Sequence, residues 1–153
     1  MKIEVVPGVW SSPLDESVAE DIVGAMIIMA VRLGIAHIPC DYRVILSSQK
    51  NETWDGARGM SIAHCDKKRC DATIYIMRED EIINMISTVG HELVHVKQFI
   101  TEGLDIDKSL YQGNTWQINE GEDIDIDSPW EREAYEMEPV LLDYYLQYLE
   151  RNK

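Results

Sequence analysis

The sequence predicts a compact α+β fold in which a small mixed sheet packs on an N-terminal helix and on a second, more central helix. The chain has 153 residues, a length typical of one domain that buries a core without disulfides. Apolar residues recur with helical spacing in 17–33, 81–102 and 129–150. Strand-like runs lie at 42–46, 60–64 and 72–77. No repeat or linker divides the chain, so residues 1–153 are predicted to form one domain.

The first helix is predicted to end at Leu33, because Gly34 is a typical stop, and to begin at a cap formed by Asp15 or Ser17. Its apolar positions have the spacing of one buried face. They are Val18, Ile22, Met26, Met29 and Leu33. It should therefore be a core helix.

The strands follow as Tyr42–Leu46, Met60–His64 and Ala72–Met77, the last two joined by a charged turn at 66–69. Residues 110–118 suit either a further strand or a packed loop. The order of helix, small sheet and second helix favours an α+β arrangement.

The central helix is predicted over Glu81–Glu102, with Asp80 as N-cap and Gly103 just past its end. One apolar stripe consists of Ile82, Ile86, Val89, Leu93, Val96 and Ile100. A second, polar stripe consists of Asn84, Thr88, His91, His95 and Gln98. Gly90 costs about 1 kcal/mol relative to Ala in a helix, and we expect it to let a strand approach closely.

The last helix is predicted to begin at Ser128-Pro129, because Ser at the N-cap and Pro at the first helical position are strong start signals. It should end near Glu150. Pro139 is expected to kink or interrupt it.

The central helix carries His91-Glu92-Leu93-Val94-His95, which has the form H-E-x-x-H. Residues four apart share a helix face, so both imidazoles can bind one Zn²⁺ while the glutamate between them serves as general base. The alternative is an ordinary amphipathic helix with two polar histidines.

A catalytic zinc needs a third protein ligand. The chain has 4 histidines, and the other two, His37 and His64, precede the motif. No histidine follows it, so a downstream carboxylate is expected. The candidates are Glu131 and Glu133.

The motif resembles the signature of the zincin metallopeptidases, and Glu131-Arg132-Glu133-Ala134 is similar to the E-x-x-A of gluzincins. Gluzincins include the repressor-cleaving peptidases of mobile elements and the CAAX prenyl endopeptidases. The stretches HELVHVKQ and PWEREA also look like small metallopeptidases encoded in phages and prophages. The resemblance covers about His91 to Tyr135.

This resemblance implies a zincin-like fold whose C-terminal helix supplies the third ligand, with the metal held by His91, His95 and Glu131. Ala134, on the same side as Glu131, would let the two helices approach. As an alternative role, Glu131 is also the third residue of a capping box that begins at Ser128.

The resemblance further implies Zn²⁺ as cofactor, a protein or peptide as substrate, and Glu92 as the base that activates water. Gln98 would either support a ligand or be solvated. Thr73–Met77 could be an edge strand that pairs with an extended substrate. Candidate donors to the oxyanion are Tyr111, Tyr135, Tyr145 and His64.

The net charge of −14 argues against nucleic acid, which needs a basic surface, and against anionic membranes. No apolar signal segment opens the chain, and the run 22–31 is too short to cross a bilayer, so a cytoplasmic protein is expected. The 3 cysteines form an odd count that fits reduced thiols. A second metal site at Cys65 and Cys70 is a weaker alternative.

Residues 119–127 are strongly acidic and are expected to form a solvated loop. The spacing of Asp123, Asp125 and Asp127 resembles the start of an EF-hand. Ser128 and Ala134 occupy the positions where an EF-hand needs Gly and Glu, so an EF-hand is excluded. Weak binding of Ca²⁺ by these carboxylates is the remaining alternative.

Three functions are compatible with the sequence. The leading one is a small zinc-dependent endopeptidase of gluzincin type. The second is a metal-stabilised acidic binding module that sequesters a host or phage protein without cleaving it, although such a module has no use for Glu92. The third is a zinc hydrolase that acts on small amides. The oligomeric state is not predicted.

Overall fold

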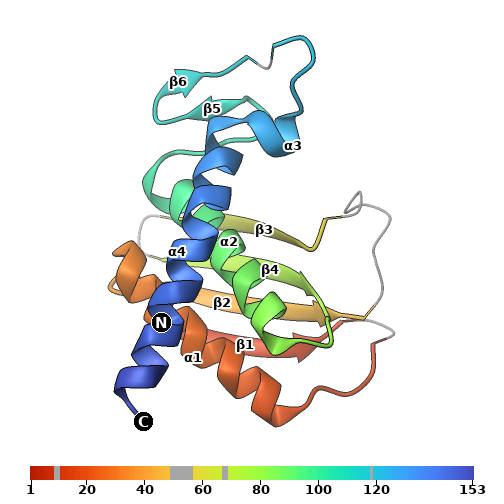
Figure 1. Ribbon diagram of the computed structural model, residues 1–153. Coiled ribbons are helices and arrows are strands. Elements are labelled where there is room, and N and C mark those ends of the chain that lie inside the picture. Colours follow the sequence, from red (N-terminus) through yellow and green to blue (C-terminus); the bar gives the residue numbers. More distant parts are fainter. Residues whose placement is uncertain (9–10, 49–56, 67–68, 118) are drawn as a thin grey trace.

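The structure, a computed structural model, describes residues 1–8, 11–48, 57–66, 69–117 and 119–153. Its elements are, in chain order, β1 (Lys2–Pro7), α1 (Glu16–Leu33), β2 (Cys40–Ser47), β3 (Gly59–Cys65), β4 (Cys70–Met77), α2 (Ile82–Thr101), β5 (Leu110–Tyr111), β6 (Asn114–Thr115), α3 (Ile124–Asp127) and α4 (Pro129–Arg151) (Figure 1). The predicted α+β fold with a small mixed sheet is confirmed.

The main sheet has the order β1-β2-β4-β3, in which β3 alone runs antiparallel to its neighbour. The prediction that Thr73–Met77 is an edge strand is wrong. This segment belongs to β4, where Ile74 pairs with Val44 on one side and with Ser61 on the other. The edge strand on that side is β3.

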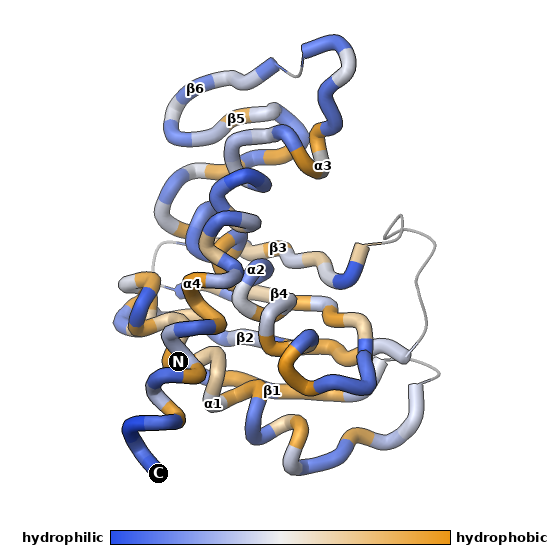
Figure 2. The backbone as a smooth tube through the Cα atoms, viewed as in Figure 1, coloured by the Kyte–Doolittle hydropathy of each residue, from blue (hydrophilic) through white to orange (hydrophobic). Residues whose placement is uncertain are grey.

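The core lies between one face of the sheet and the helices. Alternate residues of β2 and β4 are buried, as expected when one face of a sheet is covered. Helices α1 and α2 lie on that face and α4 packs across them (Figure 1). Figure 2 shows the hydrophobic segments gathered in this layer, while the C-terminal end of α4 is hydrophilic.

Helix α1 has the predicted ends. The Asp15 carboxylate accepts a hydrogen bond from the backbone N–H of Ser17 at 2.9 Å, and Gly34 has a φ of 75°, a left-handed conformation that glycine adopts without strain. Val18, although predicted in the apolar stripe, is only partly buried.

Helix α2 begins at Ile82 after an extended Glu81, which makes no side-chain cap. The predicted Asp80 N-cap is therefore wrong by one residue. Gly103 has a φ of 66° and lies just past the end, as predicted.

The close approach expected at Gly90 involves helices and not a strand. A Cβ there would lie 3.3 Å from Met29 Sδ on α1 and 3.5 Å from Leu141 Cβ on α4. The strand approach occurs at Gly59 in β3 instead, where a Cβ would lie 2.8 Å from Thr88 Cγ2 and 3.1 Å from Glu92 Cγ.

Helix α4 begins as predicted, with the Ser128 hydroxyl accepting a hydrogen bond from the Glu131 N–H at 3.4 Å. The helix then continues through Pro139 to Arg151, so the predicted interruption does not occur. Leu141 and Tyr145, beyond the proline, are buried in the core, and this packing holds the segment helical.

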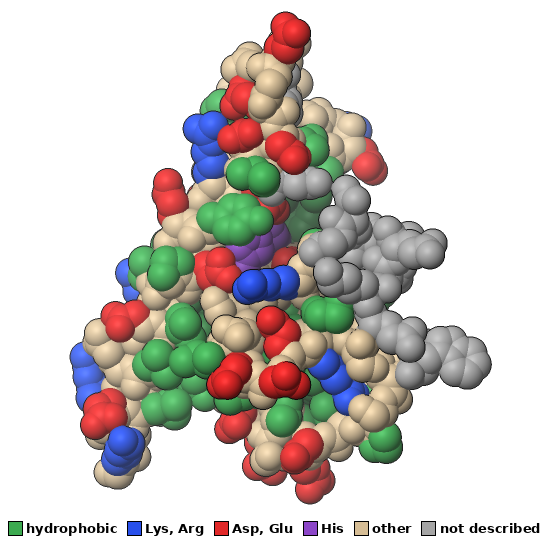
Figure 3. Space-filling view, turned by 45° about the vertical axis from the view of Figure 1, so that its right-hand side comes forward, with side chains coloured by type: hydrophobic (Ala, Val, Ile, Leu, Met, Phe, Trp, Pro, Cys, Tyr) green, Lys and Arg blue, Asp and Glu red, His purple; other side chains and the backbone are tan. Residues whose placement is uncertain are grey.

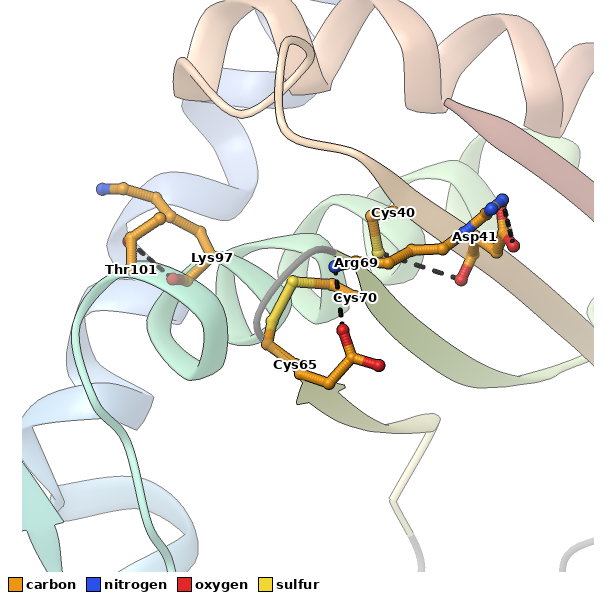
Figure 4. Close-up of a disulfide and its surroundings, with 8 residues drawn as sticks. Cys40, Asp41, Cys65, Arg69, Cys70, Lys97 and Thr101 are labelled. Atoms are coloured by element: carbon orange, nitrogen blue, oxygen red, sulfur yellow. Dashed lines mark hydrogen bonds and ion pairs between the residues drawn. A yellow bond between two sulfur atoms is a disulfide. The ribbon is translucent and has the colours of Figure 1, made fainter.

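Cys65 and Cys70 form a disulfide between facing residues of β3 and β4 (Figure 4), so the prediction of reduced thiols and the alternative of a metal site are both wrong for this pair. The count of cysteines could not reveal it, because the pairing depends on the hairpin register, which brings the two Cα atoms to 4.1 Å. Cys40 is a buried free thiol. The cysteine count thus no longer supports a reducing compartment.

Among the described residues, no helix combines the length and apolar character needed to traverse a lipid bilayer.

Candidate metal centre

His91, His95 and Glu131 meet at one point between α2 and α4. One ligand atom from each lies within 4.8 Å of the others. Glu131 directs one carboxylate oxygen to His95 Nε2 at 2.5 Å and the other to His91 Nε2 at 3.4 Å. The three residues that the sequence singled out are therefore brought together.

Small residues allow the two helices to come close enough for this meeting. Ala134, one turn after Glu131, is fully buried in the core. Gly90, beside His91, lies under Leu141 of α4. A side chain larger than alanine at either position would push α4 away and withdraw the Glu131 carboxylate from the histidines.

Gln98 fixes the orientation of the His95 ring. Its amide N–H donates to the Trp130 carbonyl oxygen at 2.9 Å, and its amide oxygen lies 2.8 Å from His95 Nδ1. A carbonyl can only accept, so the amide oxygen must face the imidazole, and Nδ1 must carry the proton. In the neutral imidazole this leaves Nε2 with a lone pair directed at Glu131. Gln98 is completely buried, which agrees with the supporting role predicted for it.

Glu138 lies on the corresponding side of the His91 ring, and its place in the site was not predicted from the sequence. Its carboxylate lies 3.7 Å from His91 Nδ1 and also accepts a hydrogen bond from the Ser87 hydroxyl at 3.0 Å. The signal was present in the sequence, because Glu138 follows Glu131 by two helical turns and shares its face.

The histidines and carboxylates of this cluster shift one another's pKa values. Burial alone would lower the pKa of His91, but the neighbouring carboxylates of Glu131 and Glu138 outweigh it and raise the pKa to about 10. The pKa of His95 is likewise raised against the effect of burial. Burial alone would raise the pKa of Glu131, yet the two histidines lower it to about 2. A carboxylate thus faces two rings that retain their protons.

Glu92 lies beside this cluster with 5% of its surface exposed. Burial raises the pKa of its carboxyl group, while the neighbouring His95 and His91 act in the opposite direction. The close contact with Gly59 places it directly under the start of β3. Glu92 is therefore a buried carboxyl next to a cationic centre.

The cluster opens into a cleft of about 670 Å³. Strand β3, helices α2 and α4, and the connection between those helices all contribute to its walls. Figure 3 shows histidine side chains in the middle of one face of the molecule, surrounded by hydrophobic and acidic side chains. A ligand bound in the cleft would contact both the cluster and Glu92.

Glu133, the second candidate for the third ligand, points elsewhere. Its carboxylate accepts a hydrogen bond from the Tyr111 hydroxyl at 2.9 Å and lies 3.9 Å from Lys97 Nζ. The same hydroxyl lies 2.5 Å from the Glu102 carboxylate, and its single proton serves one of the two carboxylates at a time. Glu133 therefore belongs to a bracing network that joins α2, β5 and α4.

Of the four candidate oxyanion donors, Tyr135 alone lines the cleft. Its ring lies 4.6 Å from the His91 ring, measured between centroids. Tyr111 serves the bracing network, Tyr145 is buried in the core, and His64 lies exposed on β3 opposite Asp71. Sequence alone could not rank them, because the choice depends on tertiary contacts.

The acidic stretch is partly helical, since it contains α3. The Asp127 carboxylate accepts a hydrogen bond from the Asp123 N–H at 2.7 Å, and both Asp127 and Glu122 lie near Arg132. The Asp125 side chain and Ile118 lie outside the described residues. Within the described part of the chain, the His91, His95 and Glu131 group is the one cluster with the composition of a metal site.

Two imidazoles and one carboxylate form a donor set that suits a divalent transition metal, and the outer nitrogens of both rings already have partners. The residues present therefore fit a metal ion. Searches against protein-family models, curated proteins and solved structures give no match.

Proposed function

We propose that this chain is a zinc-dependent endopeptidase. The observation that carries the proposal is the position of the buried Glu92 beside the His91, His95 and Glu131 group, within one open cleft. This donor set is typical of catalytic zinc sites, which keep one position for water or substrate. A purely structural site needs no buried carboxylate next to it.

Zinc, when bound, supplies a Lewis acid that lowers the pKa of water and polarises a carbonyl group. Glu92 accepts a proton from the water whose oxygen adds to the peptide carbonyl carbon. Glu92 then delivers that proton to the nitrogen as the C–N bond breaks, so the products are a carboxylic acid and an amine. Its buried position beside His91 and His95 places the carboxyl group where it can both accept and release that proton.

Strand β3 is the proposed docking edge for substrate. Gly59, Met60 and Ser61 line the cleft, and β3 is an outer strand of the main sheet. The outward backbone groups of such a strand can pair with an extended peptide. Tyr135, in the opposite wall, is the proposed hydroxyl donor to the oxyanion.

The variant Glu92→Gln tests this proposal, because it keeps the size of the side chain and removes the base. We expect hydrolysis of casein and of a peptide library to fall by about a hundredfold or more, while zinc content stays at the wild-type level. Glu136→Gln, an exposed carboxyl on α4, is the matched control.

Unchanged hydrolysis in Glu92→Gln would contradict the proposal. A wild-type protein that retains a bound protein partner without cleaving it would favour the binding module instead. Cleavage restricted to small amides would favour the third function.

A further inference from the structure

We propose that the cleft selects peptides with a large apolar residue one or two positions before the scissile bond. The residues that we assign to this selection are Phe99, Ile106 and Ile126, here called the apolar subsite. The inference rests on the proposed peptidase function and names the class of substrate.

All three residues line the cleft that contains the metal ligands. Phe99 follows His95 by one helical turn and shares its face of α2. Ile106 lies in the segment after α2, and Ile126 lies in α3. The subsite is thus built by the beginning and the end of the long connection between α2 and α4, where it passes the end of the cleft.

The two isoleucines are exposed although the connection has its own small core. Leu104, Tyr111 and Trp130 are 6%, 3% and 2% exposed and pack together with Phe99. Ile106 and Ile126 are 46% and 56% exposed. The buried set holds the connection in place, so the exposed isoleucines are available as an apolar wall for a ligand.

The rim that carries Ile126 is fixed by polar contacts. The Asp127 carboxylate accepts a hydrogen bond from the Asp123 N–H at 2.7 Å, which joins the last residue of the short helix α3 to the residue just before it begins. Arg132 of α4 lies 3.6 Å from Asp127, which ties α3 to the helix that carries Glu131. Ile126 and the candidate ligand Glu131 are therefore positioned by the same helix.

The order of the elements gives the direction in which a peptide lies. Strand β3 is antiparallel to β4, and α2 returns along the sheet directly after β4, so β3 and α2 run the same way. Gly59, at the start of β3, packs on Thr88 and Glu92 in the first part of α2. Antiparallel strand pairs are more stable than parallel ones, so we expect the peptide to run antiparallel to β3. Such a peptide runs in the direction opposite to α2.

The N-terminal part of such a peptide lies towards Phe99. Phe99 is about 6 Å from His95 along the helix, the length of about two residues of extended chain. Arg58 and Glu138 also line the cleft, and Glu138 contacts Ser87 in the first part of α2, away from Phe99. An apolar side chain is therefore expected before the cleaved bond and not after it.

The experiment digests a peptide library with the zinc-loaded protein and maps cleavage sites by mass spectrometry. Leu, Ile, Met or Phe should be enriched at one of the two positions before the bond. Two peptides that differ only there, Leu against Ser, then give a selectivity ratio of kcat/KM. Ile106→Ser and Ile126→Ser should each lower this ratio about tenfold. Ile124→Ser, an exposed isoleucine of the same short helix that does not line the cleft, should keep the ratio.

Binding of the same two peptides to zinc-loaded Glu92→Gln separates the two proposals. Tighter binding of the Leu peptide, lost in the Ile126→Ser background, supports the apolar subsite even if the wild type cleaves nothing. Cleavage without preference at those positions, or a preference only after the bond, overturns the subsite and leaves peptidase activity standing. Equal binding of both peptides also overturns the subsite.

Discussion

At the scale of single residues, the site depends on groups that orient the ligands as much as on the ligands themselves. Gln98 and Glu138 each occupy the outer nitrogen of one imidazole. Each ring is thus turned so that Nε2 faces Glu131. Such outer partners commonly account for ten- to hundredfold effects on metal affinity.

Gln98→Ala tests this orientation. We expect the affinity for zinc, measured by competition with a chelator, to fall by roughly 10- to 100-fold, because the His95 ring loses the acceptor at Nδ1. Gln147→Ala, on the exposed end of α4, is the control. Equal affinities in both variants, at equal thermal midpoints, would contradict the role of Gln98.

The pKa values of the cluster predict how the stability of the metal-free protein depends on pH. His91 has a pKa of about 10 in the folded protein against an ordinary 6.5, so its contribution is complete below about pH 6.5 and is lost as pH rises through 10. Glu131 has a pKa of about 2 against 4.5, so its contribution is present above about pH 4.5 and is lost as pH falls through 2. The joint contribution is greatest between these two ordinary values.

The measurement is the thermal midpoint of chelator-treated protein between pH 6.5 and 10. The wild-type midpoint should fall as pH rises, and the fall should be smaller in Glu131→Gln, which lacks the carboxylate that holds the proton on His91. Parallel curves for the two proteins would refute the coupling.

The sequence predicted part of this residue-level picture. His91, Glu92 and His95 are recognisable from spacing alone, and Glu131 from its E-x-x-A context. Gln98 is predictable because it lies on the same helical stripe. Glu138 was missed, and Tyr135 could not be chosen among the four candidate donors, because both depend on how closely α4 approaches α2, which is a property of packing.

At the scale of elements, two glycines set the distances between the parts of the site. Gly59 brings β3 against α2, and Gly90 brings α1 and α4 against it. The sequence identified Gly90 as a point of close approach but assigned the wrong partner. A single sequence does not say which element crosses a helix at a given glycine.

Gly59→Ala should destabilise the protein by about 1–3 kcal/mol, because the new methyl group meets Thr88 Cγ2 at 2.8 Å and the Tyr75 carbonyl oxygen at 3.0 Å. Gly90→Ala is the comparison. There the nearest atom is the flexible Met29 side chain at 3.3 Å, and alanine gains about 1 kcal/mol of helix propensity. Urea unfolding should rank Gly59→Ala as the less stable variant, and the reverse order would contradict this account of β3.

The ends of helices were predicted where capping residues mark them, and strands were missed where pairing with another strand determines them. Asp15, Gly34, Ser128 and Gly103 mark helix ends through their own chemistry. Strand β1 was missed because Lys2–Pro7 is short and becomes a strand by pairing with β2. Likewise, the sequence placed β4 at the edge of the sheet, whereas β3 lies there, because the order of the strands is decided by pairing.

At the scale of the whole molecule, the site joins three parts of the chain that are distant in sequence. Helix α2 supplies two candidate ligands and the buried carboxyl, α4 supplies the third candidate ligand, and β3 supplies the opposite wall. The long connection between α2 and α4 closes one end of the cleft. The sequence predicted the three residues that meet but not this enclosure, because the connection has little regular structure of its own.

The measurement that tests the central claim most directly is the zinc content of the purified protein after reconstitution, by elemental analysis. The account predicts about one zinc per chain in the wild type and in Glu133→Ala, and its loss in His95→Ala and Glu131→Ala, with all four proteins folded. Zinc retained in Glu131→Ala but lost in Glu133→Ala, or absent from the wild type, would contradict it.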